Sequence, residues 1–198
     1  ICSGQSNMAV RWGGPKEVRE KISFPLIRQV WLHEPWSKTP LDDAKCSEWR
    51  PCIPANVGGY TAVGYFFAHE IHRETGIPIG LIVMVAGGNR VEPWIPPEAF
   101  KEIPELKDIA GLVANVDIST EAGNQAYVQA VERLKSWIPH AEKMIREKRG
   151  FIPMPNLPLL TMGSEHCGLF NSQVFPLAPF AVKGVIWYQG ESNGGEGD

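Results

Sequence analysis

The stretch IGLIVMVA at residues 79–86 is apolar at every position except for one glycine, and the turn GGNR at residues 87–90 follows it directly. A strand that helices bury on both faces has such a continuous apolar run, without alternating polar positions. The glycine pair predicts that the strand ends in a tight polar turn. The stretch therefore predicts a buried strand of an α/β sheet.

Other segments with strand or helix character alternate along the chain. The expected strands are residues 1–3, 27–32 and 182–188, the last of them buried. The expected helices are residues 61–75, with Val63, Phe66, Phe67 and Ile71 along one face, and residues 124–149, bent or broken near Pro139. Pro-rich loops are expected at residues 34–59 and 150–160. This alternation predicts a three-layer α/β/α fold with a mostly parallel central sheet.

The composition is that of an ordinary globular protein. The 198 residues predict a single domain over residues 1–198, with 43% hydrophobic and 21% charged side chains. The net charge of −3 gives no indication of nucleic acid or of an anionic membrane surface as a partner. No apolar run reaches the roughly 18 residues of a spanning helix. The chain has no initiator Met and no basic leader, so we expect a processed or excised chain.

The four cysteines are Cys2, Cys46, Cys52 and Cys167, and their spacing fits no zinc motif. Cys46 and Cys52 are close enough in sequence for a small disulfide loop if the protein is exported. Four reduced and mostly buried thiols are the alternative. No metal or organic cofactor is implied.

Three polar turns follow the predicted strands, at residues 4–7 (GQSN), 87–90 (GGNR) and 189–193 (QGESN). The carboxyl ends of parallel strands meet at one edge of a sheet, where ligands bind. Hydrolysis of an ester by a serine needs a hydroxyl, a base and donors for the oxyanion. Ser6 can supply the hydroxyl, while its own N–H, the Gly88 N–H and the Asn193 amide can supply donors. Taken singly, Ser6 suits a helix N-cap and the other two suit ordinary turns, so the joint occurrence of the three favours chemistry.

Two motifs resemble those of a known family. GQSNM at residues 4–8 and WYQGESN at residues 187–193 resemble the SGNH hydrolase superfamily, and more narrowly its sialate O-acetylesterase-like carbohydrate esterases. AVGYFF at residues 62–67, the glycine turn up to Trp94 and the segment from Asn171 to Gly184 are similar to that family as well. The resemblance implies a flavodoxin-like SGNH fold.

The resemblance also assigns roles to residues. It implies that Ser6 is the nucleophile and that Gly88 and Asn193 form the oxyanion hole. Glu191 is a second-rank candidate for the acid that orients a histidine. The residues that would flank the pocket and bind substrate are Gln5, Asn89, Arg90 and Gln189. Asn89 stands where the family usually has Thr.

The catalytic histidine is not evident. The family carries it in an Asp-x-x-His block after the asparagine, and no such motif occurs among the 198 residues. His33, after a strand, and His166, in a loop, are the candidates within the chain, whereas His69, His72 and His140 are expected on helices. We therefore expect the chain to be incomplete at its C-terminal end and to have little esterase activity alone, because loss of a triad member leaves only about 10³–10⁴-fold acceleration over water.

The expected reaction is removal of an O-acetyl group from a carbohydrate, by resemblance a sialic acid. The alternatives are an acetylxylan-type polysaccharide deacetylase and a non-catalytic carbohydrate-binding relative. Arg90 would pair with a sialic-acid carboxylate, or else with Glu92 or Glu98. The candidates for stacking on sugar are Trp12, Trp36, Trp49 and Trp94.

A weaker hypothesis makes residues 194–197 (GGEG) an anion-binding turn, for which a mobile glycine loop is the simpler account. By resemblance the protein is expected to be exported. The sequence does not specify the sugar, the acetyl position or the oligomeric state.

Overall fold

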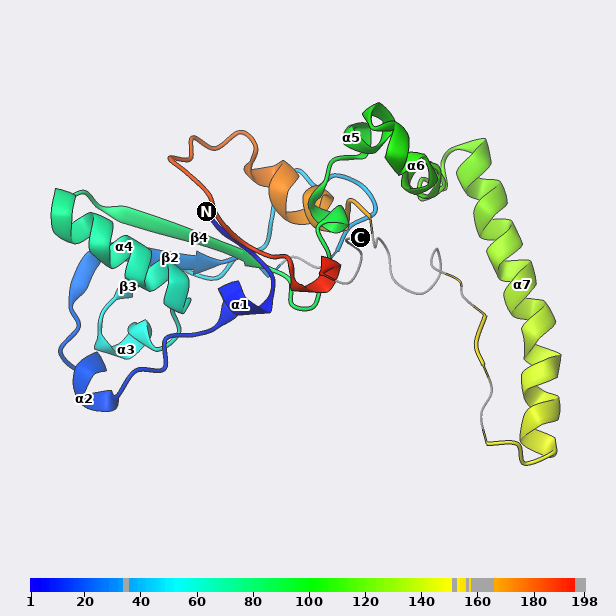
Figure 1. Cartoon of the computed structure of the whole chain (residues 1–198), viewed down its shortest axis with the longest axis horizontal. Coiled ribbons are helices and arrows are strands. Elements are labelled where there is room, and N and C mark those ends of the chain that lie inside the picture. The colour runs from blue at the N-terminus through cyan, green and yellow to red at the C-terminus, as the bar shows by residue number, and fades with distance from the viewer. Residues whose placement is uncertain (34–35, 151–152, 156, 158–165, 195–198) are drawn as a thin grey trace. The chain divides into compact units, whose positions relative to one another are not determined.

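The computed structural model describes residues 1–33, 36–150, 153–155, 157 and 166–194. The chain forms two compact units (Figure 1). As far as they are described, unit 1 contains residues 1–33, 42–91 and 173–194, and unit 2 contains residues 36–41 and 92–172. The single catalytic domain over residues 1–198 stays a prediction. Ser6, Gly88 and Asn193 all lie in unit 1.

Unit 1 is built on a five-stranded sheet with the strand order β3-β2-β4-β1-β5. Strand β4 is parallel to β1 and β2, β5 is parallel to β1, and β3 pairs antiparallel with β2. The strands are β1 (Cys2–Gly4), β2 (Phe24–Trp31), β3 (Arg50–Cys52), β4 (Ile79–Val85) and β5 (Ile186–Tyr188). The predicted α/β class with a mostly parallel sheet is confirmed. The carboxyl ends of β1, β2, β4 and β5 point to the same edge, as the parallel pairing requires.

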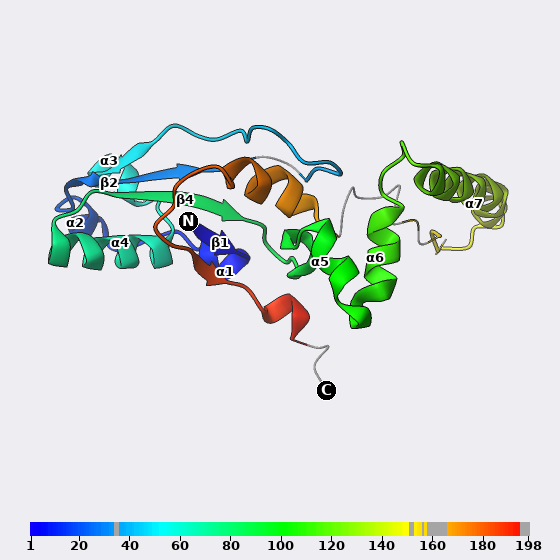
Figure 2. The same cartoon turned by 90° about the horizontal axis from the view of Figure 1, so that it is seen from above.

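Helix α4 (Ala62–Thr75) packs on β2 and β4 (Figure 2). It begins after Thr61 and ends at Gly76, whose φ of 67° is in the left-handed region that a C-terminal glycine adopts. A side chain at Gly64 would lie 3.0 Å from Cys2 Sγ and 2.7 Å from Thr61, so glycine lets the helix approach the sheet closely. The shorter helices of this unit are α1 (Ser6–Ala9), α2 (Lys16–Arg19) and α3 (Pro54–Val57).

The buried face of α4 differs from the predicted one. Tyr65 and Ala68 are buried, whereas Phe66 and Phe67 are 57% and 47% exposed. The apolar residues predicted to share a face span too wide an arc to be buried together. The structure instead buries the face with Gly64, Tyr65 and Ala68, and the two small residues let the helix lie close to the sheet.

Three other predictions need correction. The loop predicted at residues 34–59 contains β3 and α3 in its described part. Strand β5 begins only at Ile186, and it is not buried, because Trp187 and Tyr188 at the sheet edge are 43% and 46% exposed. Helix α7 (Glu121–Arg146) continues through Pro139 without a break, since proline removes one hydrogen bond while the turns on both sides keep theirs.

Unit 2 is helical. Its elements besides α7 are η1 (Glu92–Trp94), α5 (Pro97–Glu102), η2 (Pro104–Leu106) and α6 (Lys107–Ala114). Thr120 caps α7, because its hydroxyl accepts a hydrogen bond from the Gly123 N–H at 3.0 Å. Three short helical turns follow later in the chain: η3 (Phe170–Val174), η4 (Phe175–Leu177) and η5 (Glu191–Asn193). Of these, η4 and η5 belong to unit 1. The loop predicted at residues 150–160 lies largely outside the described residues.

The cysteines are free thiols, and Cys2, Cys52 and Cys167 are buried while Cys46 is exposed. Burial raises the pKa of Cys2 to about 11 and that of Cys52 to about 12, so both stay protonated at neutral pH. The alternative of mostly buried thiols is the one that the structure shows.

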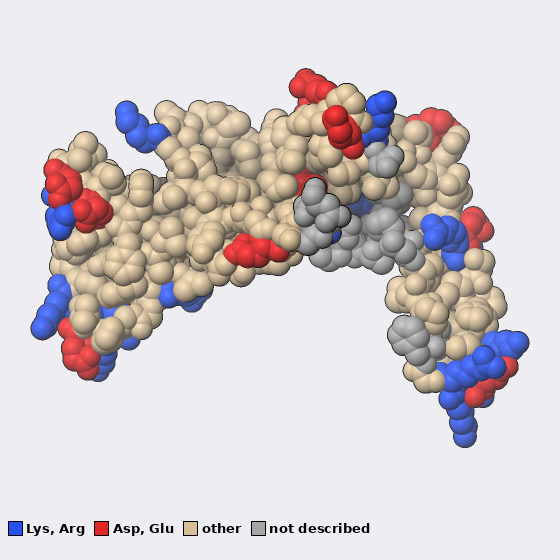
Figure 3. Space-filling view, viewed as in Figure 1, with Lys and Arg blue, Asp and Glu red and all other residues tan. Residues whose placement is uncertain are grey.

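The charged side chains of the described residues are scattered, and both signs are interspersed on the face drawn in Figure 3. No described helix is both long enough and apolar enough to span a membrane.

Candidate active site

Ser6 is the first residue of α1, immediately after β1. The N-cap of this helix is Gln5, so the alternative role of Ser6 as a helix cap is wrong. The Ser6 side chain is exposed, and its hydroxyl makes no hydrogen bond to any described residue. Since the first N–H groups of a helix have no partner within the helix, the Ser6 N–H is available as a donor.

The glycine turn after β4 lies beside Ser6. A Cβ built on Gly87 would be 3.8 Å from Ser6 Cβ, and the Ala86 N–H donates to Gly4 O at 3.1 Å. The neighbouring Gly88 has φ of 71°, and a Cβ built on it would have nothing within 4 Å. The Gly88 backbone is therefore open to an approaching molecule, and its conformation favours glycine.

Asn193, in η5, is held to the glycine turn through its side-chain oxygen. Its Oδ1 accepts hydrogen bonds from the Val91 N–H at 3.0 Å and from Gln189 Nε2 at 2.8 Å. Because the oxygen is engaged on both sides, the Nδ2 hydrogens are the donors that this side chain presents elsewhere.

Gln189 links the second and third turns. Besides Asn193, its Nε2 donates to Asn89 O at 3.2 Å. The Asn89 side chain donates to Gly87 O at 3.3 Å, which closes the glycine turn locally. These contacts show that Gln189 and Asn89 join the turns, and the substrate binding predicted for both residues stays a prediction. No short motif indicates this linkage, because the two partners are 100 residues apart in the sequence.

Gln5 lies under the site and not at its rim. Its N–H donates to Tyr188 O at 3.0 Å, and its side chain is only 4% exposed. Its Oε1 is buried and has no hydrogen-bond partner among the described residues. Substrate binding by Gln5 stays a prediction, and burial favours a positioning role for it.

Glu191 accepts a hydrogen bond from the Asn7 side chain, next to Ser6. Both side chains reach the surface, so this contact joins the first turn to the third. The acid role of Glu191 stays a prediction, since its described partner is an amide and not a histidine. Arg90 is exposed in the glycine turn.

Ser6 has no hydrogen bond to a histidine among the described residues. In unit 1, His69 and His72 pack against Phe24 with ring centroids 4.7 Å and 6.3 Å apart, and His33 follows β2. In unit 2, His166 packs on Phe100 and His140 is exposed on α7. The described residues contain no group of His, Cys, Asp and Glu that is arranged to hold a metal ion.

The tryptophans predicted to stack on sugar have different environments. Trp12 stacks on Tyr65 with centroids 4.9 Å apart, and Trp94 is buried. Trp49 is 48% exposed beside Gly80, while Trp36 belongs to unit 2. Trp12 and Trp94 therefore serve packing. Residues 195–197 of the turn that was hypothesised to bind an anion (residues 194–197) lie outside the described residues.

Comparison with known proteins found several relatives, of which three are described. The chain is 26% identical over 204 residues to the sialate O-acetylesterase of Homo sapiens and 25% identical over 204 residues to that of Pongo abelii, with 98% of the chain covered in each case. It is 26% identical to the mouse (Mus musculus) sialate O-acetylesterase over 211 residues. The chain spans only about a third of these relatives, 31% of the human protein and 34% of the mouse protein.

A solved structure, a carbohydrate acetylesterase from Xanthomonas citri, superposes with a TM-score of 0.59 at 27% identity, over 97% of this chain and 32% of that chain. No protein-family model matches the sequence. Both comparisons extend over nearly the whole chain, which includes all three turns. They confirm that the chain resembles the sialate O-acetylesterase-like carbohydrate esterases, the SGNH hydrolases that its motifs indicated.

Proposed function

We propose that the protein is a serine esterase that removes O-acetyl groups from carbohydrates. The observation that carries this proposal is the meeting of three strand ends in unit 1. Ser6 lies beside Gly87, and Asn193 is bound to the same glycine turn through Val91 and Gln189. A nucleophile next to convergent donors is the arrangement that acyl transfer requires.

In the proposed reaction, the Ser6 hydroxyl attacks the acetyl carbonyl and forms a tetrahedral intermediate. The Ser6 N–H, the Gly88 N–H and the Asn193 amide donate to the oxyanion. Collapse of the intermediate releases the sugar hydroxyl and leaves an acetyl-Ser6, which water then hydrolyses. A histidine must take the Ser6 proton and return it to the departing sugar oxygen. No described hydrogen bond joins Ser6 to a histidine, so activity is best assayed on the complete protein.

The substrate is inferred from the relatives, four of which are named sialate O-acetylesterases. We propose an O-acetylated sialic acid as the substrate, with acetylated xylan as the second candidate. Export from the cell is proposed on the same resemblance.

The test is acetate release by the complete protein from O-acetyl-N-acetylneuraminic acid and from acetylated xylan in parallel. We expect a kcat/KM at least tenfold higher for the sialic acid. A preference for xylan would move the proposal to a polysaccharide deacetylase. Binding of either sugar without acetate release would support the non-catalytic relative and refute the esterase.

Replacement of Asn193 tests the oxyanion hole. We expect Asn193→Ala to lower kcat by about 10²–10³-fold with little change in KM, because the donor acts on charge that develops in the transition state. Asn193→Asp keeps an oxygen for the Val91 N–H but removes the NH₂ donor, and it should lose as much.

The control is Asn124→Ala, an exposed position on α7, which should leave kcat unchanged. Wild-type kcat in Asn193→Asp would show that Asn193 only holds the turn and donates nothing to the substrate.

A further inference from the structure

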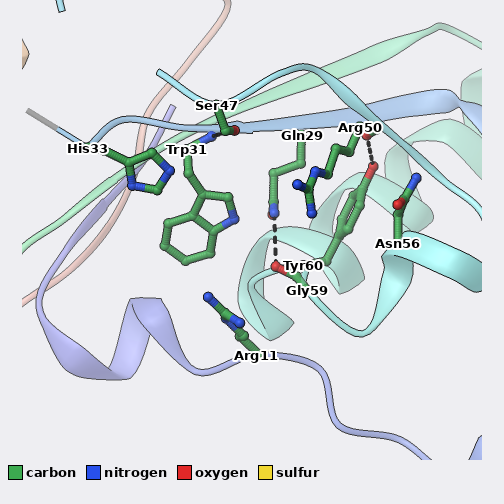
Figure 4. A pocket seen from close by; sticks show the side chains of 9 residues that line it. All are labelled: Arg11, Gln29, Trp31, His33, Ser47, Arg50, Asn56, Gly59 and Tyr60. Atoms are coloured by element: carbon green, nitrogen blue, oxygen red, sulfur yellow. Dashed lines mark hydrogen bonds between the residues drawn. The ribbon is translucent and has the colours of Figure 1, made fainter. Parts of the chain in front are cut away.

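Unit 1 contains a second site that includes neither Ser6 nor the oxyanion donors, although His33, a candidate for the catalytic base, lies in its wall. It is a cavity of about 230 Å³ on β2, bounded by β3 and by the segment after α1 (Figure 4). Its wall includes Arg11, Gln29, Trp31 and Arg50. The cavity is smaller than the roughly 300 Å³ at which pockets for drug-sized ligands begin, so it suits a single small ring.

The cavity carries unbalanced positive charge. Two guanidinium groups, of Arg11 and Arg50, line it, and its described lining contains no carboxylate. Neither arginine forms an ion pair with a carboxylate of the described residues. Figure 4 shows the Arg50 side chain on one side of the cavity and that of Arg11 on another. An acceptor-only anion would satisfy both groups.

Two neutral polar side chains beside the arginines, Gln29 and Tyr60, are already paired. Gln29 is 3% exposed, and its Nε2 donates to Gly59 O at 3.2 Å while its Oε1 accepts from the Thr61 N–H at 3.0 Å. The Tyr60 hydroxyl donates to Arg50 O at 2.6 Å, which fixes the backbone that carries the Arg50 side chain. This part of the cavity frame is therefore set before any ligand binds, and the guanidinium groups are its charged donors.

Trp31 supplies a flat apolar wall. Its ring is half-buried, and its backbone N–H donates to Ser47 Oγ at 3.0 Å. Arg11 lies over the ring, with Cζ 5.9 Å from the centroid. In Figure 4 the indole nitrogen faces the Gln29 side of the cavity. An aromatic face beside charged donors suits a ligand with a ring at one end and an anion at the other.

We propose that this cavity binds a carboxylated sugar, with the carboxylate held by Arg11 and Arg50 and the ring against Trp31. A free inorganic anion would pair with the arginines but would have no ring to place against the indole of Trp31. The site goes beyond the esterase proposal, because it needs neither Ser6 nor the oxyanion donors. Sialic acids and uronic acids both have the required chemistry.

The test is a ligand titration of the Ser6→Ala protein, a variant from which ester turnover is removed. Binding is monitored through the NMR signal of the Trp31 indole N–H. The probes are N-acetylneuraminic acid and its methyl ester, D-glucuronic acid and D-glucuronamide, and sodium phosphate. At least one acid should bind at least tenfold more tightly than its neutral counterpart and than phosphate. The tighter acid identifies which sugar class the site accepts.

Arg11→Gln and Arg50→Gln should each weaken that binding about tenfold or more, because each removes a charged donor. Arg28→Gln is the matched control, since Arg28 lies exposed on β2, the strand that carries Trp31, but outside the cavity. This variant should bind as the parent does. Equal binding of acid and neutral probe, equal loss in Arg28→Gln, equal affinity for phosphate, or no shift with either acid would each overturn the proposal. Because binding is read without catalysis, a failed esterase assay leaves this result unaffected.

Discussion

Ser6→Ala should lower the kcat of acetate release by the complete protein by at least about 10⁴-fold, the loss typical for a serine nucleophile. The exposed hydroxyl sits at the start of α1 and bonds to no described residue, so its removal deletes chemistry and little else. Stability should change by no more than about 0.5 kcal/mol, as for surface substitutions without special contacts. The two measurements together separate a nucleophile from a structural serine.

The control for this experiment is Ser136→Ala, an exposed serine of α7 whose hydroxyl donates to Arg133 O at 2.8 Å. It should retain wild-type kcat. A mass shift of acetyl on wild-type protein quenched during turnover, absent in Ser6→Ala, would locate the covalent intermediate. Wild-type acetate release by Ser6→Ala would refute the proposed nucleophile and require a different one.

The sequence predicted the interior of unit 1 better than its edges. The apolar run at residues 79–86 contains β4, because interior strands of parallel sheets are usually covered on both faces and are apolar on both. Strand β5 has a paired neighbour only in β1, and β3 is three residues long in a Pro- and Trp-rich region. Neither strand has the periodicity from which a strand is predicted. The predicted strand at residues 182–188 is therefore longer than β5, and β3 was missed.

The residues of the candidate site could also be predicted only in part. Ser6, Gly88 and Asn193 were predictable, because each belongs to a short motif at the end of a strand. The positioning contacts were not, since Gln189 reaches Asn89 across 100 residues and Glu191 reaches Asn7 across 184. The cavity of Arg11, Trp31 and Arg50 was also missed, because its wall comes from three separate segments, and pairing of β2 with β3 brings two of them together.

Gly4→Ala, which adds a single methyl group, should strongly destabilise unit 1. Gly4 ends β1 with φ of 136°, a conformation that side chains rarely adopt, and a Cβ there would lie 2.1 Å from Tyr188 O. The obstacle is backbone, and Tyr188 O also accepts the Gln5 N–H at 3.0 Å, so it cannot move without parting β1 from β5. Backbone strain of about 1–3 kcal/mol and overpacking of a similar size together predict a loss of about 2–6 kcal/mol.

Urea unfolding followed by circular dichroism measures this loss, with Gly13→Ala as the control. A Cβ at Gly13 would have nothing within 4 Å, so that variant should stay within about 1 kcal/mol of wild type. A Gly4→Ala protein as stable as the control would mean that β1 and β5 are not in the register described. The consequence for function is direct, because the Gly4–Tyr188 contact sets where β1 ends, and Ser6 stands two residues beyond it. The glycine of the first motif is thus required by the packing of two strands, and the serine takes its position from that packing.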